Sequence, residues 1–198
     1  MPREGKARVL TDADLKRLFK VIRADTHPER NAALLYMSVG LGLRVKEIAA
    51  LSLGDVLDRR EHLRDEISLL KTMTKGGKQR HVYLTNPKVR RALQDYLAVR
   101  LNPKRYMCAP GSALFLSNKR MRFTPNSLQQ VFRRLYLAAG IEGASSHSGR
   151  RTFATRLIEK GVDIKAVSVL MGHSSVAMTA RYVEDNPERL RAIVGDVL

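Results

Sequence analysis

The sequence has a single cysteine, Cys108, no tryptophan, and aromatic residues at only 6% of its 198 positions. One cysteine excludes an intramolecular disulfide, a CxxC redox motif and zinc-finger spacing, so we expect a reducing compartment. Because aromatic residues are scarce, the core must be built of Leu, Val, Ile, Ala and Met. The composition is that of a globular protein with a sizeable core.

Long apolar runs and cofactor motifs are also lacking. The first residues, MPREGKARVLTDADL, hold no stretch of signal-peptide length, and no run approaches the roughly 18 apolar residues of a membrane span. The histidines show neither HxxxH nor HExxH spacing, and no Asp-rich cluster, P-loop or GxGxxG is present. We therefore expect no metal, no cofactor and no membrane partner, and a location in the cytoplasm, at the nucleoid.

Acidic residues are few relative to basic ones. The 36 Lys and Arg face 19 Asp and Glu, which gives a net charge of +17. Nucleic acid is the partner that best matches this excess, because neutralised phosphates release counterions and add affinity. An anionic membrane surface is disfavoured, since the basic residues are spread along the chain. An RNA-binding module is weaker still, because no RNP1-like aromatic motif appears.

The pattern along the chain predicts one unit over residues 1–198, mainly helical with one small antiparallel sheet. No repeat, low-complexity run or linker divides it. Two strands flanking the Gly76-Gly77 turn, within residues 66–84, form the expected hairpin. Capping residues and apolar spacing predict helices that start near Thr11 and cover approximately residues 29–39, 45–51, 87–101, 125–139, 147–160, 163–171, 175–182 and 187–198.

Four short segments place cations, histidines or a tyrosine at the breaks between these elements. They are residues 42–47 (GLRVKE), 74–80 (TKGGKQR), 146–152 (SHSGRRT) and 171–182 (MGHSSVAMTARY). Taken singly, each has an ordinary interpretation: Arg44 as a surface arginine, the Gly-rich hairpin tip as a solvated turn, and Tyr182 as a half-buried core phenol. His147 and Arg150, however, lie three residues apart on one helical face, where both could meet one anion.

Together the segments resemble the catalytic domain of the tyrosine recombinase and phage integrase family. That family has an arginine in G-L-R-x-x-E, a lysine on a β-hairpin, an H-x-x-R motif, a G-H motif and a C-terminal tyrosine. The matching residues, in order, are Arg44, Lys75, His147, Arg150, His173 and Tyr182, with Glu47 at the acidic position. The resemblance covers roughly residues 10–183.

The resemblance implies a DNA strand-breaking and rejoining enzyme that needs neither metal nor ATP. Tyr182 would be the nucleophile that forms a phosphotyrosine, and Lys75 the general acid for the 5′ oxygen. Arginines suit the clamping of a phosphate, because they bind bidentately and stay charged. Glu47 would orient the site. Further DNA contacts are expected from the basic neighbours Lys46, Lys78, Arg80 and Arg151.

Two features depart from the family. Most relatives carry an N-terminal core-binding domain, which is absent here, so the chain is expected to be an isolated catalytic domain or a naturally short member such as the fimbrial recombinases. Gly149 and Arg151 stand where many relatives have Leu and His. The residues 184–198 have an apolar face that either packs on its own core or is exchanged between protomers of a synaptic tetramer. A type IB topoisomerase and a non-catalytic DNA-binding protein on the same scaffold are the rival functions.

Overall fold

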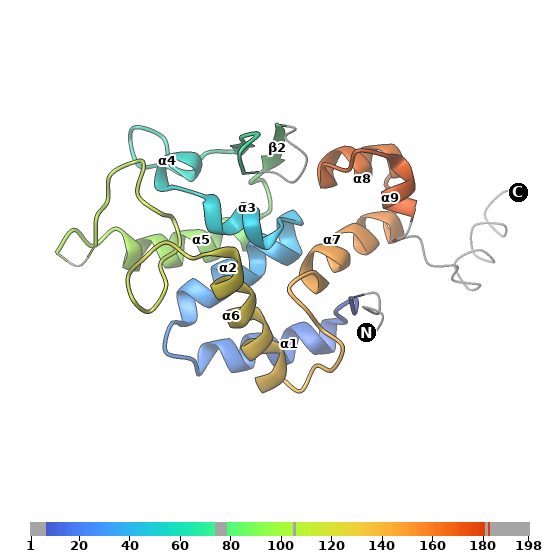
Figure 1. The fold of residues 1–198 in the computed structure, drawn as a ribbon, viewed down its shortest axis with the longest axis horizontal. Coiled ribbons are helices and arrows are strands. Elements are labelled where there is room, and N and C mark those ends of the chain that lie inside the picture. The colour runs from blue at the N-terminus through green and yellow to red at the C-terminus, as the bar shows by residue number, and fades with distance from the viewer. Residues whose placement is uncertain (1–6, 74–78, 105, 181, 183–198) are drawn as a thin grey trace, which may run out of the picture.

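The computed structural model describes residues 7–73, 79–104, 106–180 and 182. Helices dominate these residues, and the fold class is the expected one (Figure 1). The elements in chain order are α1 (Asp12–Arg23), α2 (Pro28–Leu41), α3 (Val45–Ala50), α4 (Leu53–Val56), β1 (Glu66–Leu69), β2 (Arg80–Tyr83), α5 (Pro87–Arg100), α6 (Pro125–Ala138), α7 (Ser148–Glu159), α8 (Ile164–Met171) and α9 (Val176–Ala180).

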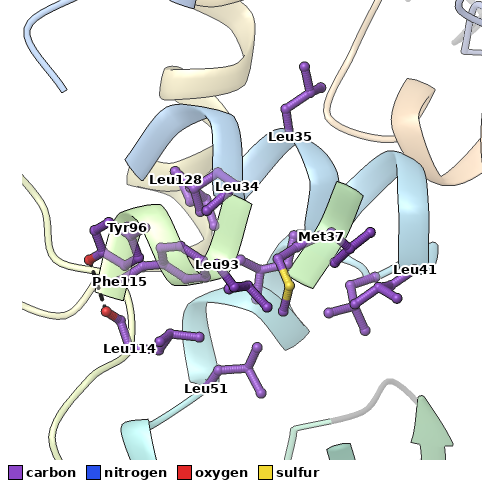
Figure 2. Close-up of a cluster of buried hydrophobic side chains, with 14 of the residues drawn as sticks. Leu34, Leu35, Met37, Leu41, Leu51, Leu93, Tyr96, Leu114, Phe115 and Leu128 are labelled. Atoms are coloured by element: carbon purple, nitrogen blue, oxygen red, sulfur yellow. Dashed lines mark hydrogen bonds between the residues drawn. The ribbon is translucent and has the colours of Figure 1, made fainter. Parts of the chain in front are cut away.

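Helix α2 is the centre of the fold. It contacts α1, α3, α5 and α7, and apolar residues occupy nearly all of its faces, as is typical of a helix enclosed by others. Figure 2 shows Leu34 and Met37 of α2 beside Leu93 of α5, in a cluster of side chains that are almost entirely buried. The Tyr96 hydroxyl closes this cluster by donating to the Leu114 carbonyl at 2.9 Å. The core is thus Leu-rich, as the composition predicted.

The two strands form the predicted antiparallel hairpin. Their register pairs Glu66 with Tyr83 and Leu69 with Arg80. Ile67 and Val82 point into the core, because alternate side chains of a strand face opposite sides. β2 also contacts α8, so the sheet lies between the centre of the fold and its C-terminal part. The hairpin tip, with the predicted Gly76-Gly77 turn, is outside the described residues.

Short-range rules set the helix boundaries. Thr11 and Thr124 each accept a hydrogen bond from the N3 backbone in a capping box, and Asn86 caps α5 ahead of Pro87. The sequence pattern missed α4, which has only four residues and one buried side. The irregular connection after α5 was predicted, and it is held by arginine. Arg122 donates to the last carbonyls of α3, including that of Ala50 at 2.7 Å.

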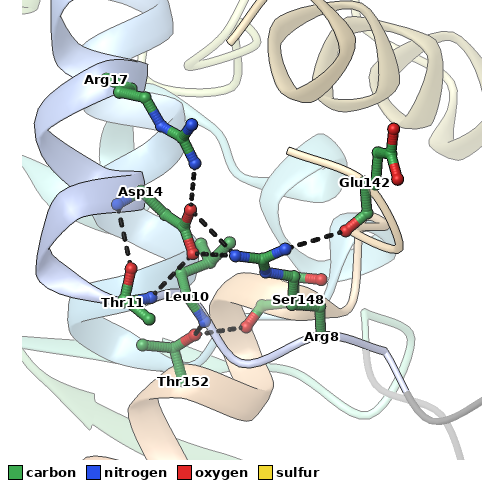
Figure 3. Close-up of polar contacts among 8 residues, drawn as sticks. All are labelled: Arg8, Leu10, Thr11, Asp14, Arg17, Glu142, Ser148 and Thr152. Atoms are coloured by element: carbon green, nitrogen blue, oxygen red, sulfur yellow. Dashed lines mark hydrogen bonds and ion pairs between the residues drawn. The ribbon is translucent and has the colours of Figure 1, made fainter. Parts of the chain in front are cut away.

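Buried hydrogen bonds fasten the segment before α1 to α7, and a partly exposed ion-pair cluster around Asp14 lies beside them (Figure 3). The Leu10 backbone N–H donates to Thr152 Oγ1, which donates in turn to the Ser148 carbonyl, each at 2.8 Å. Asp14 accepts hydrogen bonds from the Arg8 and Arg17 guanidinium groups at 3.0 and 2.6 Å. The start of α7, where the H-x-x-R motif lies, is therefore held from the N-terminal side.

Candidate active site

The ends of α2 and α8 meet at the Arg150 side chain. Both helices end at a left-handed glycine, Gly42 with φ of 63° and Gly172 with φ of 59°. Arg150 Nη1 donates to the Gly42 carbonyl at 2.5 Å, and its Nη2 donates to the Met171 carbonyl. These carbonyls belong to helix ends, which carry partial negative charge. Arg150 is 3% exposed, so the fold fixes its guanidinium firmly.

Arg44 lies at the start of α3, directly after the α2 terminus. Its Nη1 donates to Glu47 Oε1 at 2.9 Å, while its backbone N–H donates to Glu47 Oε2 at 2.7 Å. The G-L-R-x-x-E spacing therefore produces a capping box, in which the N3 acid returns to the N-cap residue. The Arg44 side chain is 17% exposed and Glu47 is fully buried. Glu47 thus holds Arg44 by two hydrogen bonds, and its predicted role in orienting the site stays a prediction.

His173 and Tyr182 form the other wall of the site. Their rings stack with centroids 5.7 Å apart and planes 11° from parallel. His173 Nδ1 lies 2.8 Å from Thr179 Oγ1, and Thr179 is fully buried on α9. The Tyr182 backbone N–H donates to the Thr179 carbonyl at 2.9 Å. One threonine thus positions both the histidine and the tyrosine.

Charge and burial adjust the ionisable groups. Burial lowers the pKa of His173 to about 4, with help from the cations of Arg150 and Arg44, so this histidine is neutral near pH 7. Burial alone would raise the pKa of Glu47, but Arg80 and the Arg44 backbone N–H outweigh it and hold the pKa below its usual value. Burial, then the neighbouring Arg44, lowers the pKa of Arg150. A guanidinium nevertheless keeps its charge near neutrality.

The remaining predicted residues lie in different places. His147 is exposed and precedes α7 as its N-cap, and Lys46 is exposed on α3. Lys75 and Lys78 lie outside the described residues. Arg80 and Arg151 were expected to contact DNA, but both are 7% exposed, and Arg80 is paired with Glu47. Both side chains are thus largely buried in the described residues, and their expected contact with DNA stays a prediction.

Sequence reasoning missed Thr179 and the true position of Arg80. Thr179 lies six residues after His173 in the G-H segment, so its place between the two predicted residues was the available signal. The partner of Arg80, Glu47, is 33 residues away in the chain.

Within the described ranges, no group of three or more His, Cys, Asp or Glu side chains is arranged to hold a metal ion. In the same residues, no helix has the length and apolar character needed to cross a membrane.

Comparisons with known proteins identify the family of the chain. Residues 8–189 match the model of the phage integrase family. The chain is 30% identical over 193 residues to the tyrosine recombinase XerC of Thermodesulfovibrio yellowstonii, covering 89% of this chain and 62% of that protein. It is 35% identical over 168 residues to XerC of Myxococcus xanthus, covering 83% of this chain and 53% of that protein.

A solved structure gives the same result for the fold. The crystal structure of the XerA recombinase superposes with a TM-score of 0.73 at 30% identity, covering 96% of this chain and 65% of that one. The chain thus spans between half and two thirds of these relatives. Its family match extends over nearly all of the described residues, including each helix end of the site. The chain therefore belongs to the phage integrase family, that of the tyrosine recombinases.

Proposed function

We propose that the protein is a site-specific recombinase that cleaves and rejoins DNA strands through a covalent 3′-phosphotyrosine at Tyr182. The observation that carries this proposal is the stacking of Tyr182 on His173, which places a phenol beside a histidine whose pKa is lowered by Arg150 and Arg44. A phosphodiester in that position would meet a nucleophile on one side and two guanidinium groups on another.

The two arginines stabilise the charge that develops on the non-bridging oxygens. Arg150 is held by the Gly42 and Met171 carbonyls, and Arg44 is held by Glu47 and, at 3.5 Å, by the Gly172 carbonyl. Each Nη carries two protons, so hydrogens remain available to an incoming phosphate. Because the fold already fixes these groups, little reorganisation is needed when the transition state forms. We propose that neutral His173 accepts a hydrogen bond from the Thr179 hydroxyl at Nδ1, so that its Nε2–H is free to donate to a phosphate oxygen.

The strand-cleavage step balances without a cofactor. Tyr182 Oη forms a bond to phosphorus as the bond from phosphorus to the 5′ oxygen breaks, and that electron pair goes to the 5′ oxygen. Lys75 is proposed to give this oxygen a proton, and His147 to take the tyrosine proton. The phosphotyrosine keeps the bond energy, so attack by a 5′ hydroxyl reverses the step. No metal or ATP takes part in this scheme.

The wider function follows from charge and family. We propose double-stranded DNA as the substrate, because the net charge is +17. Lys46 and Lys78 are proposed to contact the phosphate backbone of the DNA. Integration, excision or inversion would take place in a synaptic tetramer of this chain, in the cytoplasm at the nucleoid. The residues 184–198 are proposed to pass between protomers. Truncation after Asp185 should then abolish strand exchange while DNA binding is kept.

The test is covalent capture. Wild-type protein is incubated with nicked or supercoiled DNA in EDTA, denatured in SDS and examined for a protein–DNA adduct. Tyr182→Phe should form no adduct, and Tyr83→Phe, a half-exposed tyrosine on β2, should form as much as the wild type. No adduct on any DNA, including candidate sites with a supplied N-terminal domain, would favour a non-catalytic DNA-binding protein. Relaxation of supercoils without exchange between two sites would indicate a topoisomerase.

A further inference from the structure

Arg80 is buried where β2 meets α3 and α8. It is the first residue of β2, and its Nη2 donates to Glu47 Oε2 at 2.7 Å while its Nη1 donates to the Leu170 carbonyl of α8 at 2.6 Å. Its Nε is buried without an acceptor among the described residues. A buried donor without a partner is rare in folded proteins, so the position of this side chain calls for an explanation.

The Glu47 carboxylate is shared between two cations. Oε1 accepts from Arg44 Nη1 at 2.9 Å, and Oε2 accepts from both the Arg44 backbone N–H and Arg80 Nη2, each at 2.7 Å. One carboxylate and one arginine would have a net charge of zero, and the orienting acid would then cancel the charge that attracts a phosphate. With Arg80 included, the trio keeps a net charge of +1. Arg80 thus allows Glu47 to orient Arg44 without neutralising it.

The same side chain fixes the turn that carries His173. A Cβ built on Gly172 would lie 2.3 Å from Arg80 Cδ and 2.9 Å from its Nε. The Arg80 side chain therefore runs directly past the end of α8, in space that only glycine leaves open at position 172. Gly172 also has the left-handed φ that favours glycine, so two separate constraints act on this position. The contact joins the β-hairpin to the residue before His173.

We propose that Arg80 is a positioning residue for strand cleavage, acting through Glu47 on Arg44 and through the α8 terminus on His173, and that it does not contact DNA. This inference rests on the proposed recombinase function. It replaces the expected phosphate contact of Arg80 with an indirect role. It also gives the hairpin two attachments to the site that do not depend on its tip.

The main experiment measures single-turnover cleavage at saturating DNA together with the Kd for DNA. Arg80→Met should slow cleavage by about 10- to 100-fold, because Glu47 then opposes the charge of Arg44, with the Kd changed less than about threefold. The double variant Arg80→Met/Glu47→Gln should cleave faster than Arg80→Met, since the uncompensated carboxylate is gone. Loss of structure alone would not be reversed by removing a second buried group.

Arg100→Met is the matched control. Arg100 is 2% exposed, and it donates to the Ala113 and Met107 carbonyls on the α5 side of the fold. Arg100→Met should have a lower free energy of unfolding, measured by urea denaturation. Its cleavage rate per folded molecule should stay close to that of the wild type, unlike that of Arg80→Met. The proposal is overturned if the Kd weakens in step with the rate of Arg80→Met, or if the double variant is no faster than the single one.

A second readout does not depend on cleavage. Inorganic phosphate is titrated while the His173 ring signals are followed by NMR. Arg80→Met should weaken phosphate binding at this ring several-fold, and the added Glu47→Gln change should restore it. If the wild type binds phosphate there but never cleaves DNA, the proposed function fails, whereas the positioning of Arg44 and His173 by Arg80 can still be seen in the phosphate titration. Equal phosphate affinity in the wild type and Arg80→Met would refute the role of Arg80.

Discussion

Gly149 lies directly against Ser38 where α7 crosses α2. A Cβ built at position 149 would be 2.3 Å from Ser38 Oγ and 2.9 Å from Ser38 Cβ, distances at which the helices must move apart. The glycine in this H-x-x-R motif, where many relatives have leucine, is therefore a consequence of close helix packing in this chain. Arg150 follows immediately, so the packing also sets the position of the guanidinium that we propose binds the phosphate.

We expect Gly149→Ala to reduce the free energy of unfolding by about 1–3 kcal/mol, because overpacking outweighs the better helix propensity of alanine. Urea denaturation measures it. Gly111→Ala is the control, since a Cβ there meets nothing within 4 Å. The double variant Gly149→Ala/Ser38→Gly should lose less free energy of unfolding than the sum of the losses of the two single variants, by at least about 1 kcal/mol. Simple additivity would contradict the contact.

Asp14 is expected to stabilise the fold in a pH-dependent way. Burial raises its pKa, but hydrogen bonds from the Thr11 backbone, Arg17 and Arg8 outweigh this and lower the pKa to about 2. A lowered carboxyl pKa gives stability that is full above about pH 4 and is lost as the pH falls through 2. Asp14→Asn should therefore cost about 2 kcal/mol at pH 7, and the difference from wild type should shrink between pH 4 and 2.

Asp12→Asn on the same helix is the control for Asp14. Asp12 pairs with Arg156, but its side chain is 83% exposed, and exposed pairs contribute little. Its effect on unfolding at pH 7 should be below about 1 kcal/mol. Equal effects of the two substitutions would mean that the cluster around Asp14 in Figure 3 adds nothing beyond a surface ion pair.

His173 should lower stability as the solution is acidified. Its pKa is about 4 in the folded chain and near 6.5 when unfolded, so the unfolded state takes up a proton first as the pH falls. Stability should therefore decline between pH 6.5 and 4, and less steeply in His173→Gln. Urea denaturation at several pH values tests this. Parallel curves for the two proteins would show that the ring is not shielded from protonation.

Thr179→Val tests the contact that sequence reasoning missed. Valine keeps the shape of threonine but cannot hydrogen-bond His173 Nδ1, so the ring loses its fixed orientation. We expect cleavage at saturating DNA to slow by about tenfold or more, with little change in the Kd. Thr155→Val is the control, because the Thr155 hydroxyl is buried without a partner among the described residues. An unchanged cleavage rate in Thr179→Val would remove Thr179 from the site.

The sequence could predict those parts of the site that depend on short-range order. Gly42 and Gly172 end helices, and the Glu47 carboxylate accepts a hydrogen bond from the Arg44 backbone three residues earlier. The spacing of the motifs is enough to indicate both features. The burial of Arg80 could not be predicted, because its partners lie 33 and 90 residues away in the chain. The identity of a residue as arginine does not by itself indicate whether its side chain is buried or exposed. Helix α4 was missed because four residues give no period.

Tyr182 packs on a separate, smaller hydrophobic cluster of the described residues, formed by Ala154, Ile158, Val167 and Met171. Small clusters open at lower free energy than a main core, so backbone amides of α8 and α9 should exchange with solvent through local opening while those of α2 wait for global unfolding. Tyr182, the proposed nucleophile, could then be withdrawn by a local opening that leaves the main core intact.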